Sequence, residues 1–351
     1  MTDMMQCWEM DGIGRDRLTL RERPIPTPGR HEVLVKVGAV SLNHRDKMVI
    51  DSGRGLTLDF PFTPGSDLAG RIVAMGDDAE RFAVGDRVIS CFTPEWIDGA
   101  RAGTARTPAY RTLGGYFAGV LAEYVVLPED WLVTAPAALD DAQASTLPCA
   151  ALTAWFALVE RGGVRAGDTV LIRGTGGVAL FGLQFAKLHG AKVLVSCSSE
   201  KIDRVLALGA DHAMDRRQAD WLEALYALTD DRGADHILET VGGTFLGQSV
   251  QAAAVGGRIY QIGALVGFDI SSPVMPLMMK DVTIHGIGTG HRRAFEDMVR
   301  AVERTNMTPV IDSRFMIADL PDALDRFDTG PFGKIVIDNT TFPHHEQCMS
   351  A

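Results

Sequence analysis

The residues with the clearest chemical role lie in one glycine-rich turn. An apolar run over residues 169–173 leads into Gly174-Thr175-Gly176-Gly177-Val178-Ala179, and a helical pattern follows as far as His189-Gly190. In such a Gly-x-Gly-x-x-Ala turn, the first glycine permits the bend, the second lets the backbone approach a pyrophosphate, and the alanine allows close helix–strand packing. The N–H groups at the helix start then face the phosphates. The pattern predicts dinucleotide binding by Gly174, Thr175, Gly176, Gly177 and Val178, against the alternative of a merely tight turn.

The end of the next predicted strand, residues 192–196, indicates which dinucleotide binds. An acidic residue there would accept the ribose hydroxyls of NAD and repel the 2′-phosphate of NADP. The sequence reads Ser196-Cys197-Ser198-Ser199-Glu200-Lys201, with no acid at the strand end itself. Ser198 and Lys201, with Arg216 after the next strand-like segment, form a predicted phosphate pocket. We therefore expect NADPH, and Glu200 keeps NAD(H) open as the alternative.

These residues require a parallel sheet to position them. From about residue 150 to 290, apolar strands expected over 169–173, 192–196, 236–240, 258–263 and 282–287 alternate with helices, as in a parallel sheet covered on both faces. The first 130 or so residues are instead β-rich and punctuated by Pro and Gly. We expect a helix over 293–303, a strand over 333–337 that returns to the β-rich half, and a frayed tail from Asp338 onward.

The composition limits the partners. The 351 residues include 34 Lys and Arg against 45 Asp and Glu, and the resulting net charge of −11 would repel a nucleic acid backbone. The sequence has no run approaching about 18 apolar residues and no signal-peptide pattern, so we expect a cytoplasmic protein without a membrane span. Its five cysteines are scattered without a CxxC spacing, which is typical of reduced thiols.

Four further motifs accompany the glycine turn in sequence order. They are Pro64-Gly65-Ser66-Asp67-Leu68-Ala69-Gly70, Gly85-Asp86-Arg87-Val88, Leu147-Pro148-Cys149-Ala150-Ala151-Leu152-Thr153-Ala154-Trp155 and Phe332-Gly333-Lys334-Ile335-Val336. Together they resemble the medium-chain dehydrogenase/reductase superfamily, and most closely its zinc-independent, quinone-oxidoreductase-like branch. The resemblance extends from Pro24 to about Ile337.

The resemblance implies an α/β fold with two domains. A Rossmann domain, a doubly wound parallel sheet over residues 151–289, would be joined to a GroES-like β-rich catalytic domain that is discontinuous in sequence, over 1–150 and 290–351. The cleft between them would hold the nicotinamide and a small-molecule substrate. The family also implies a homodimer or homotetramer.

The positions that match the catalytic zinc ligands of related enzymes hold Asn43, Ser66 with Asp67, and Cys149. One cysteine beside an amide and a hydroxyl does not make the three-ligand N/S site that catalytic zinc needs. The loop over residues 91–119, where those relatives carry four structural-zinc cysteines, contains Cys91 alone. We therefore expect no metal, with an improvised site of His44, Asp67 and Cys149 as the alternative.

Three residues are predicted to act on the substrate. Asn43 resembles the asparagine of the quinone-reducing branch and would donate a hydrogen bond to a developing oxyanion, although asparagine is also a common turn residue. Arg45 follows it and, with Asp46, is better suited to an ion pair or a supporting contact. Thr153 lies where the family places a hydroxyl facing the nicotinamide, but a threonine inside a helix can equally bond its own backbone.

The remaining predicted cofactor contacts lie at the carboxyl ends of strands, where open α/β sheets bind ligands. The resemblance places the nicotinamide carboxamide against two segments, with two more residues lining the same crevice. Lys334 resembles the family lysine that reaches the cofactor, or it is a lysine that protects a strand edge. The two segments are Gly263-Ala264-Leu265 and Ile287-Gly288-Thr289, and the two residues that line the same crevice are Thr240 and Val241.

Without zinc to polarise an alcohol or a carbonyl, hydride transfer to a conjugated acceptor is the easier reaction. We therefore predict a zinc-independent, NADPH-dependent oxidoreductase acting on quinones or α,β-unsaturated carbonyls. The alternatives are an alcohol dehydrogenase with the improvised zinc site and a nucleotide-binding protein without turnover. Trp96, Tyr110, Tyr116 and Phe117 in the 91–119 loop indicate a planar or apolar substrate, or simply pack that loop.

Overall fold

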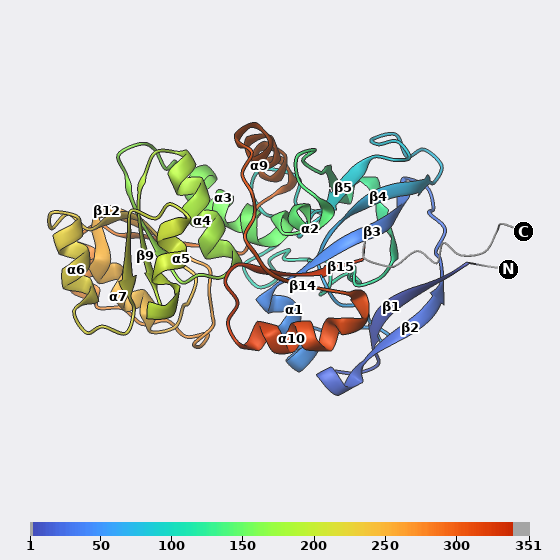
Figure 1. Cartoon of the computed structure of the whole chain (residues 1–351), viewed down its shortest axis with the longest axis horizontal. Helices are drawn as coiled ribbons and strands as arrows, with labels where there is room; N and C mark the ends of the chain where they lie inside the picture. The colour runs from blue at the N-terminus through green and yellow to red at the C-terminus, as the bar shows by residue number, and fades with distance from the viewer. Residues whose placement is uncertain (1–2, 340–351) are drawn as a thin grey trace, which may run out of the picture.

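The computed structural model describes residues 3–339, and its two large sheets lie side by side (Figure 1). The first is a six-stranded parallel sheet in the order β10-β9-β8-β11-β12-β13. Its first strand in sequence lies in the middle, so the chain winds outward in both directions, as in a Rossmann fold. The strands are β8 (Thr169–Arg173), β9 (Lys192–Cys197), β10 (His212–Asp215), β11 (Ala234–Glu239), β12 (Ala253–Gln261) and β13 (Thr283–Gly286).

Helices cover both faces of the parallel sheet, as expected from its alternating pattern. Val170 and Ile172 pack in one apolar core with α4, while Leu171 between them packs in another with α6 and α7. Successive strand residues point to opposite faces, so a strand buried on both sides is apolar throughout. The helices are α4 (Gly177–Leu188), α5 (Ile202–Ala207), α6 (Trp221–Leu228), α7 (Phe245–Ala252) and α8 (Val274–Met279).

The second sheet gathers strands from both ends of the sequence. Its order is β14-β15-β3-β4-β5-β7, and β6 also pairs with β3, while β1 and β2 form a separate hairpin. The expected return of the 333–337 strand is confirmed, because β15 pairs antiparallel with β3, with Ile335 opposite Leu42. The strands are β1 (Met4–Met10), β2 (Leu18–Pro24), β3 (Glu32–Leu42), β4 (Asp67–Met75), β5 (Arg87–Ser90), β6 (Tyr124–Pro128), β7 (Leu132–Thr134), β14 (Ile311–Phe315) and β15 (Lys334–Asp338).

A helical segment over residues 141–161 lies between the two sheets. It contains α2 (Asp141–Ala144) and α3 (Leu152–Trp155), and the stretches Leu147–Ala151 and Phe156–Arg161 are π-helical. This segment is long and apolar enough to span a membrane by composition, but 83% of its apolar window is buried inside the protein, as in a core helix. The other helices are α1 (His44–Ser52), α9 (Arg292–Thr305) and α10 (Leu320–Asp328).

The expected helix over 293–303 is confirmed as α9, and its apolar face packs into the same core as α4. The domain boundaries near residues 150 and 290 stay a prediction. The expected fraying from Asp338 is wrong for its first two residues, because Asp338 is buried in β15 and the Asn339 N–H donates to the Gly38 carbonyl at 2.8 Å. Residues 340–351 of that tail lie outside the described residues.

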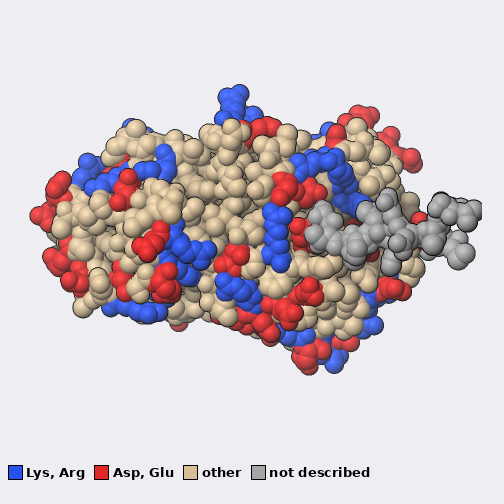
Figure 2. All heavy atoms as spheres, viewed as in Figure 1, with Lys and Arg blue, Asp and Glu red and all other residues tan. Residues whose placement is uncertain are grey.

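Acidic and basic side chains are interspersed over the face of the molecule in Figure 2. That face therefore offers no continuous basic surface of the kind that binds a nucleic acid backbone.

The segment before β15 also contacts the parallel sheet. Gly333 forms a parallel bridge with Gly176, and its N–H donates to the Thr175 carbonyl at 3.0 Å. Gly333 has a φ of 97°, and a Cβ there would lie 2.3 Å from the Val310 carbonyl oxygen, so only glycine fits. The glycine turn is thus joined directly to the strand that carries Lys334.

Candidate active site

The glycine turn has the geometry of a phosphate-binding site. Gly174 adopts a φ of 102°, and its N–H donates to the Ser196 carbonyl at 2.8 Å. Gly176 caps α4, and a Cβ built on it would meet no atom within 4 Å. The backbone at the start of this twelve-residue helix therefore borders open space, which suits a negatively charged phosphate at the positive end of the helix dipole. Thr175 and Val178 lie in the same turn.

The loops after β11 and β12 are hydrogen-bonded to each other and form one wall at the carboxyl ends of these strands. The Leu265 N–H donates to the Val241 carbonyl at 2.8 Å, and a Cβ on Gly263 would lie 1.9 Å from the Thr240 carbonyl oxygen. The Thr240 hydroxyl donates to the Arg173 carbonyl, which ties this wall to β8. The predicted residues Thr240, Val241, Gly263, Ala264 and Leu265 thus lie together at the carboxyl ends of the strands.

A buried carboxylate that the sequence analysis missed organises this wall. Glu239, fully buried, accepts hydrogen bonds from the Val241 and Gly242 N–H groups at 2.9 and 3.0 Å. It also accepts from the Ser249 hydroxyl at 2.6 Å and lies 3.7 Å from the Arg173 guanidinium. A buried charge needs such partners. The acid-to-arginine pairing between β11 and β8 was not apparent in the sequence.

The predicted 2′-phosphate residues gather at the end of β9. Lys201 donates to the Gly330 carbonyl at 2.8 Å, and burial together with the nearby Arg216 charge lowers the pKa of Lys201. Arg216 is exposed, and its N–H donates to the Cys197 carbonyl. The Ser198 hydroxyl donates to Glu200 at 2.5 Å, so these two side chains satisfy each other. Two cations thus flank the strand end.

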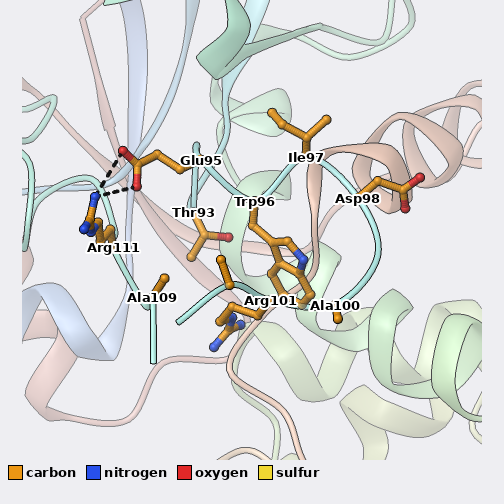
Figure 3. Close-up of a pocket in the computed structure, with 10 residues that line it drawn as sticks. Thr93, Glu95, Trp96, Ile97, Asp98, Ala100, Arg101, Ala109 and Arg111 are labelled. Carbon is orange, nitrogen blue, oxygen red and sulfur yellow. Dashed lines mark hydrogen bonds and ion pairs between the residues drawn. The ribbon is translucent and has the colours of Figure 1, made fainter. Parts of the chain in front are cut away.

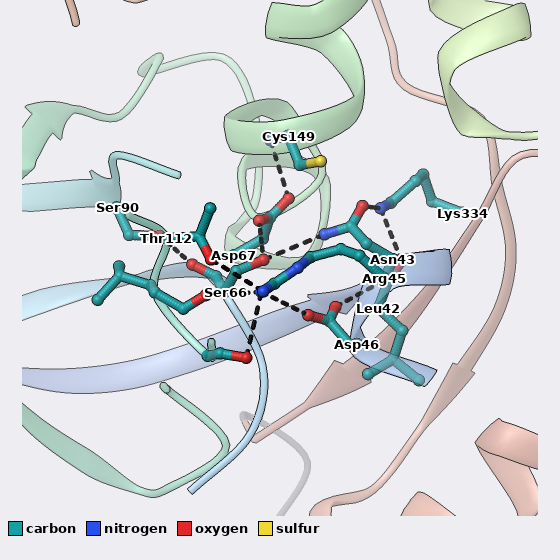
Figure 4. A network of polar contacts seen from close by, with 12 residues as sticks. Leu42, Asn43, Arg45, Asp46, Ser66, Asp67, Ser90, Thr112, Cys149 and Lys334 are labelled. Carbon is teal, nitrogen blue, oxygen red and sulfur yellow. Dashed lines mark hydrogen bonds and ion pairs between the residues drawn. The ribbon is translucent and has the colours of Figure 1, made fainter. Parts of the chain in front are cut away.

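Asn43 and Lys334 meet at the junction of the two sheets (Figure 4). The Lys334 ammonium group, 4% exposed, donates to Asn43 Oδ1 at 2.5 Å and to the Leu42 carbonyl at 2.7 Å. An ammonium group only donates, so the oxygen of the Asn43 amide must face Lys334. Its nitrogen then faces Ser66 Oγ at 3.3 Å. The same side chain also acts on the buried Asp67 carboxyl group: burial raises the pKa of Asp67, and the hydrogen bond from the Asn43 amide opposes that shift.

Arg45 is held by the loop that follows β5. Its guanidinium donates to the Leu113 carbonyl at 2.7 Å and to the Thr112 hydroxyl at 2.8 Å, and it lies 3.4 Å from Asp46. Asp46 in turn accepts from the Asn43 N–H at 2.8 Å. Arg45 therefore supports the position of Asn43 through its neighbours.

Thr153 is 1% exposed and lies in α3, between the two π-helical stretches.

The last predicted segment, residues 287–289, follows β13, where the Ile287 N–H donates to the Gln261 carbonyl at 3.0 Å. Tyr110, from the 91–119 loop, packs against this segment, and its hydroxyl lies 3.4 Å from the Gly288 carbonyl oxygen. The Thr289 hydroxyl is buried without a hydrogen-bond partner among the described residues.

Two family models match the chain. The alcohol dehydrogenase GroES-like domain matches residues 29–137, and the zinc-binding dehydrogenase model matches residues 177–304. The chain is 36% identical to a zinc-type alcohol dehydrogenase-like protein from Schizosaccharomyces pombe, over 92% of this chain and 96% of that protein. The chain belongs to the medium-chain dehydrogenase/reductase superfamily.

Other members of the superfamily agree with this assignment. Human quinone oxidoreductase is 28% identical over 92% of this chain and 94% of its own length. A Sinorhizobium meliloti 1021 protein assigned as an alcohol dehydrogenase has a TM-score of 0.94 and 58% identity, over 96% of this chain and 99% of that one. The chain is an NAD(P)H-dependent oxidoreductase of this superfamily.

The residues at the superfamily's zinc positions do not fit that metal. Asp67 accepts from the Ser66 hydroxyl at 2.6 Å and from the Cys149 N–H at 3.0 Å. His44 of the improvised set instead faces the Phe327 ring, 6.3 Å away between centroids. Within residues 3–339, no group of three or more His, Cys, Asp or Glu is arranged to hold a metal.

Replacing Asp46 by Asn tests the burial of this carboxyl group. Burial raises the pKa of Asp46 from 3.8 to about 6. The folded state therefore holds a proton that the unfolded state has released, and it loses stability as the pH rises through this interval. We expect the unfolding free energy of wild type minus that of D46N to fall by about 1–3 kcal/mol between about pH 4 and about pH 7. Urea denaturation at each pH measures the unfolding free energies of the wild type and of D46N.

Asp51, on the same helix, is the matched control. Burial raises its pKa, but the hydrogen bonds from Arg15 and Lys47 outweigh burial and lower it overall. The corresponding difference for D51N should therefore rise, rather than fall, as the pH increases in the acidic range. A difference for D46N that is independent of pH would contradict the assignment.

Proposed function

We propose that this oxidoreductase is zinc-independent, uses NADPH and reduces quinones or α,β-unsaturated carbonyls. The observation that carries the proposal is the Asn43 amide, oriented by Lys334 at a position where zinc-dependent relatives have a metal ligand. The amide nitrogen, which contacts Ser66 and Asp67, would turn an N–H to the oxygen on which charge develops when the acceptor binds. A conjugated acceptor already delocalises this charge, so such a donor suffices without a metal.

The cofactor would lie along the carboxyl ends of the parallel strands. The start of α4 would bind the pyrophosphate, Lys201 and Arg216 the 2′-phosphate, and the segment 287–289 the nicotinamide. When bound, the reduced nicotinamide supplies the hydride. Asn43 then holds the acceptor oxygen, Thr153 lines the nicotinamide side, and the proton comes from water or from a positioned hydroxyl.

A second function is favoured by the relatives described as alcohol dehydrogenases. A structure described as an NAD-dependent alcohol dehydrogenase is 31% identical, with a TM-score of 0.85. In that case the chain would oxidise a simple alcohol and would need a metal at the improvised site of His44, Asp67 and Cys149. The donor set described above argues against it.

The first test measures NADPH oxidation by metal-analysed protein with a benzoquinone, a naphthoquinone, an alkenal, an enone and a simple aldehyde. We expect turnover of the conjugated acceptors at sub-stoichiometric zinc, and a loss of about 10²-fold in kcat for Asn43→Ala. Asn43→Asp is the matched variant, because it keeps an acceptor for Lys334 and removes the donor, so it should lose as much. Activity with the aldehyde alone, at about one zinc per chain, would overturn the proposal.

Cofactor preference is tested at the two cations beside β9. The double variant Lys201→Ala, Arg216→Ala should raise KM for NADPH by about 10- to 100-fold, because charge-assisted hydrogen bonds to the 2′-phosphate are lost. KM for NADH should stay unchanged. Arg217→Ala, at an exposed neighbour, is the control. An equal effect on both cofactors would show that these side chains do not read the 2′-phosphate.

We also propose that the protein forms a homodimer or homotetramer and works in the cytoplasm. The described cysteines, Cys7, Cys91, Cys149 and Cys197, are all free, which suits a reducing compartment.

For the assembly, the structure offers one edge of the parallel sheet. Strand β13 is the last of its sheet, so this edge is open to a second copy. Next to it, residues 265–279 expose a group of large apolar side chains. They are Leu265, Val266, Phe268, Ile270, Val274, Met275, Met278 and Met279.

Sedimentation velocity tests this assembly. The wild type should sediment as a multiple of its 37.9 kDa chain, and the double variant Phe268→Asp, Met278→Asp should sediment as a monomer. Phe268 is 79% exposed, so these changes place charge on the surface without disturbing the core. Val84→Asp, at a 62% exposed position in the turn between β4 and β5, should have no effect. A monomeric wild type would contradict the proposal.

A further inference from the structure

A cavity of about 400 Å³ adjoins the segment predicted to hold the nicotinamide. Its walls come from the 91–119 loop, from the helical segment that ends at Arg161, and from β13 with the residues after it. The lining residues contain two arginines and a histidine but no aspartate or glutamate, although the chain as a whole is acidic. They are Trp96, Arg101, Phe156, Arg161, Ile284, His285, Gly286, Ile287, Gly288 and Thr289.

Arg101 is held in this cavity by aromatic rings rather than by a carboxylate. Its guanidinium carbon lies 4.4 Å from the centre of the Trp96 ring and 4.7 Å from that of Tyr110. Its Nε is buried without a hydrogen-bond partner, and no ion pair of Arg101 occurs among residues 3–339. Burial lowers the pKa of Arg101, and no carboxylate opposes that effect. Arg101 as a whole is half-buried, so the terminal nitrogens of its guanidinium group can donate to a ligand in the cavity.

The nearest acids are already engaged elsewhere. Arg101 also borders a second cavity, of about 270 Å³, which contains Glu95 and Asp98 (Figure 3). Glu95 pairs with Arg111 at 3.1 Å, and the two side chains point toward each other in Figure 3. Asp98 accepts from the Gly99 N–H at 2.7 Å and lies 3.6 Å from the His291 ring.

A second cation and a second unsatisfied group face the same cavity. Arg161 packs over the Phe156 ring, 5.1 Å from its centre, and has no ion pair among the described residues. Thr289, whose hydroxyl is buried without a partner among the described residues, also lines this cavity and belongs to the predicted nicotinamide site. The cavity therefore extends from the predicted nicotinamide site to Arg101 and Arg161. We call the positively charged part around these two arginines the recess.

We propose that this recess selects substrates that carry an anionic group, a carboxylate or a phosphate, and that Arg101 is the residue that recognises it. The planar guanidinium fork matches such an oxyanion in two parallel hydrogen bonds. Trp96 and Tyr110 hold the fork in place and shield it from water, while Arg161 adds positive charge. This inference rests on the proposed function, since it specifies which conjugated carbonyl compounds that site reduces.

The test uses three short enones that differ in charge. The probes are 4-oxo-2-pentenoate, its neutral methyl ester, and an enone of the same length that carries a phosphate. We expect KM for the carboxylate, the phosphate or both to be about 10- to 100-fold below that for the ester. Arg101→Met should remove this preference by raising KM of the anion, with kcat and the kinetics of the ester unchanged.

Two matched variants separate recognition from folding of the loop. Arg106→Met removes an exposed arginine from the same loop and should keep the preference. Arg101→Lys keeps the positive charge without the forked guanidinium group, and this variant should keep only part of the preference for the anion. Unchanged kinetics of the ester show that the loop is intact.

The outcomes distinguish this inference from the proposed function. Equal KM values for ester and anions, or a preference that survives Arg101→Met, would overturn the anion recess while leaving the reductase activity in place. If none of the enones or quinones turned over, the proposed function would fail. Calorimetric titration of the carboxylate and of the ester into the NADP⁺ complex then tests anion binding in the recess without turnover. Tighter binding of the carboxylate that is lost in Arg101→Met supports the recess. Equal binding of the two compounds refutes it.

Discussion

The buried ammonium group of Lys334 is the constraint on which the site depends. A charge that is 4% exposed needs strong acceptors, and it finds them in the Leu42 carbonyl and Asn43 Oδ1. From Asn43 the polar contacts continue through Ser66 to Asp67, and Asp67 accepts the N–H of Cys149. One chain of contacts thus runs from β15 to the π-helical stretch before Thr153, and it orients the amide that would meet the substrate.

The Rossmann half of the protein could be predicted because its signals are local. The strand, the glycine turn and the following helix are adjacent in sequence, so residues 169–173 matched β8 in full. The return of the last strand was also predicted, since an apolar strand without a neighbour must pair elsewhere. The shorter β10 was expected only as a strand-like segment, because four half-buried residues carry little periodicity.

The contacts that assemble the site could not be predicted in the same way. Asn43 and Lys334 are 291 positions apart, and their pairing follows from the register of β15 on β3, which sequence alone does not reveal. The pairing of Glu239 with Arg173 is hidden because both appear as ordinary strand residues. Arg101 and Tyr110 belong to a loop without regular structure, so neither the direction of their side chains nor their contacts could be derived. The π-helical stretches have no known sequence signal on which to base a prediction.

The pairing of β15 with both the glycine turn and β3 has a consequence for biosynthesis. Residues 39–42 of β3 face Ile335–Asp338 of β15, and Thr175 accepts the N–H of Gly333. On the ribosome, Asn43 and the glycine turn emerge long before these partners are made. The nascent chain therefore presents an unpaired strand segment and an incomplete nucleotide site for most of its synthesis. The contacts that Gly333 and Lys334 make with Thr175 and Asn43 therefore form late, and the candidate active site is completed only after the parallel sheet has emerged.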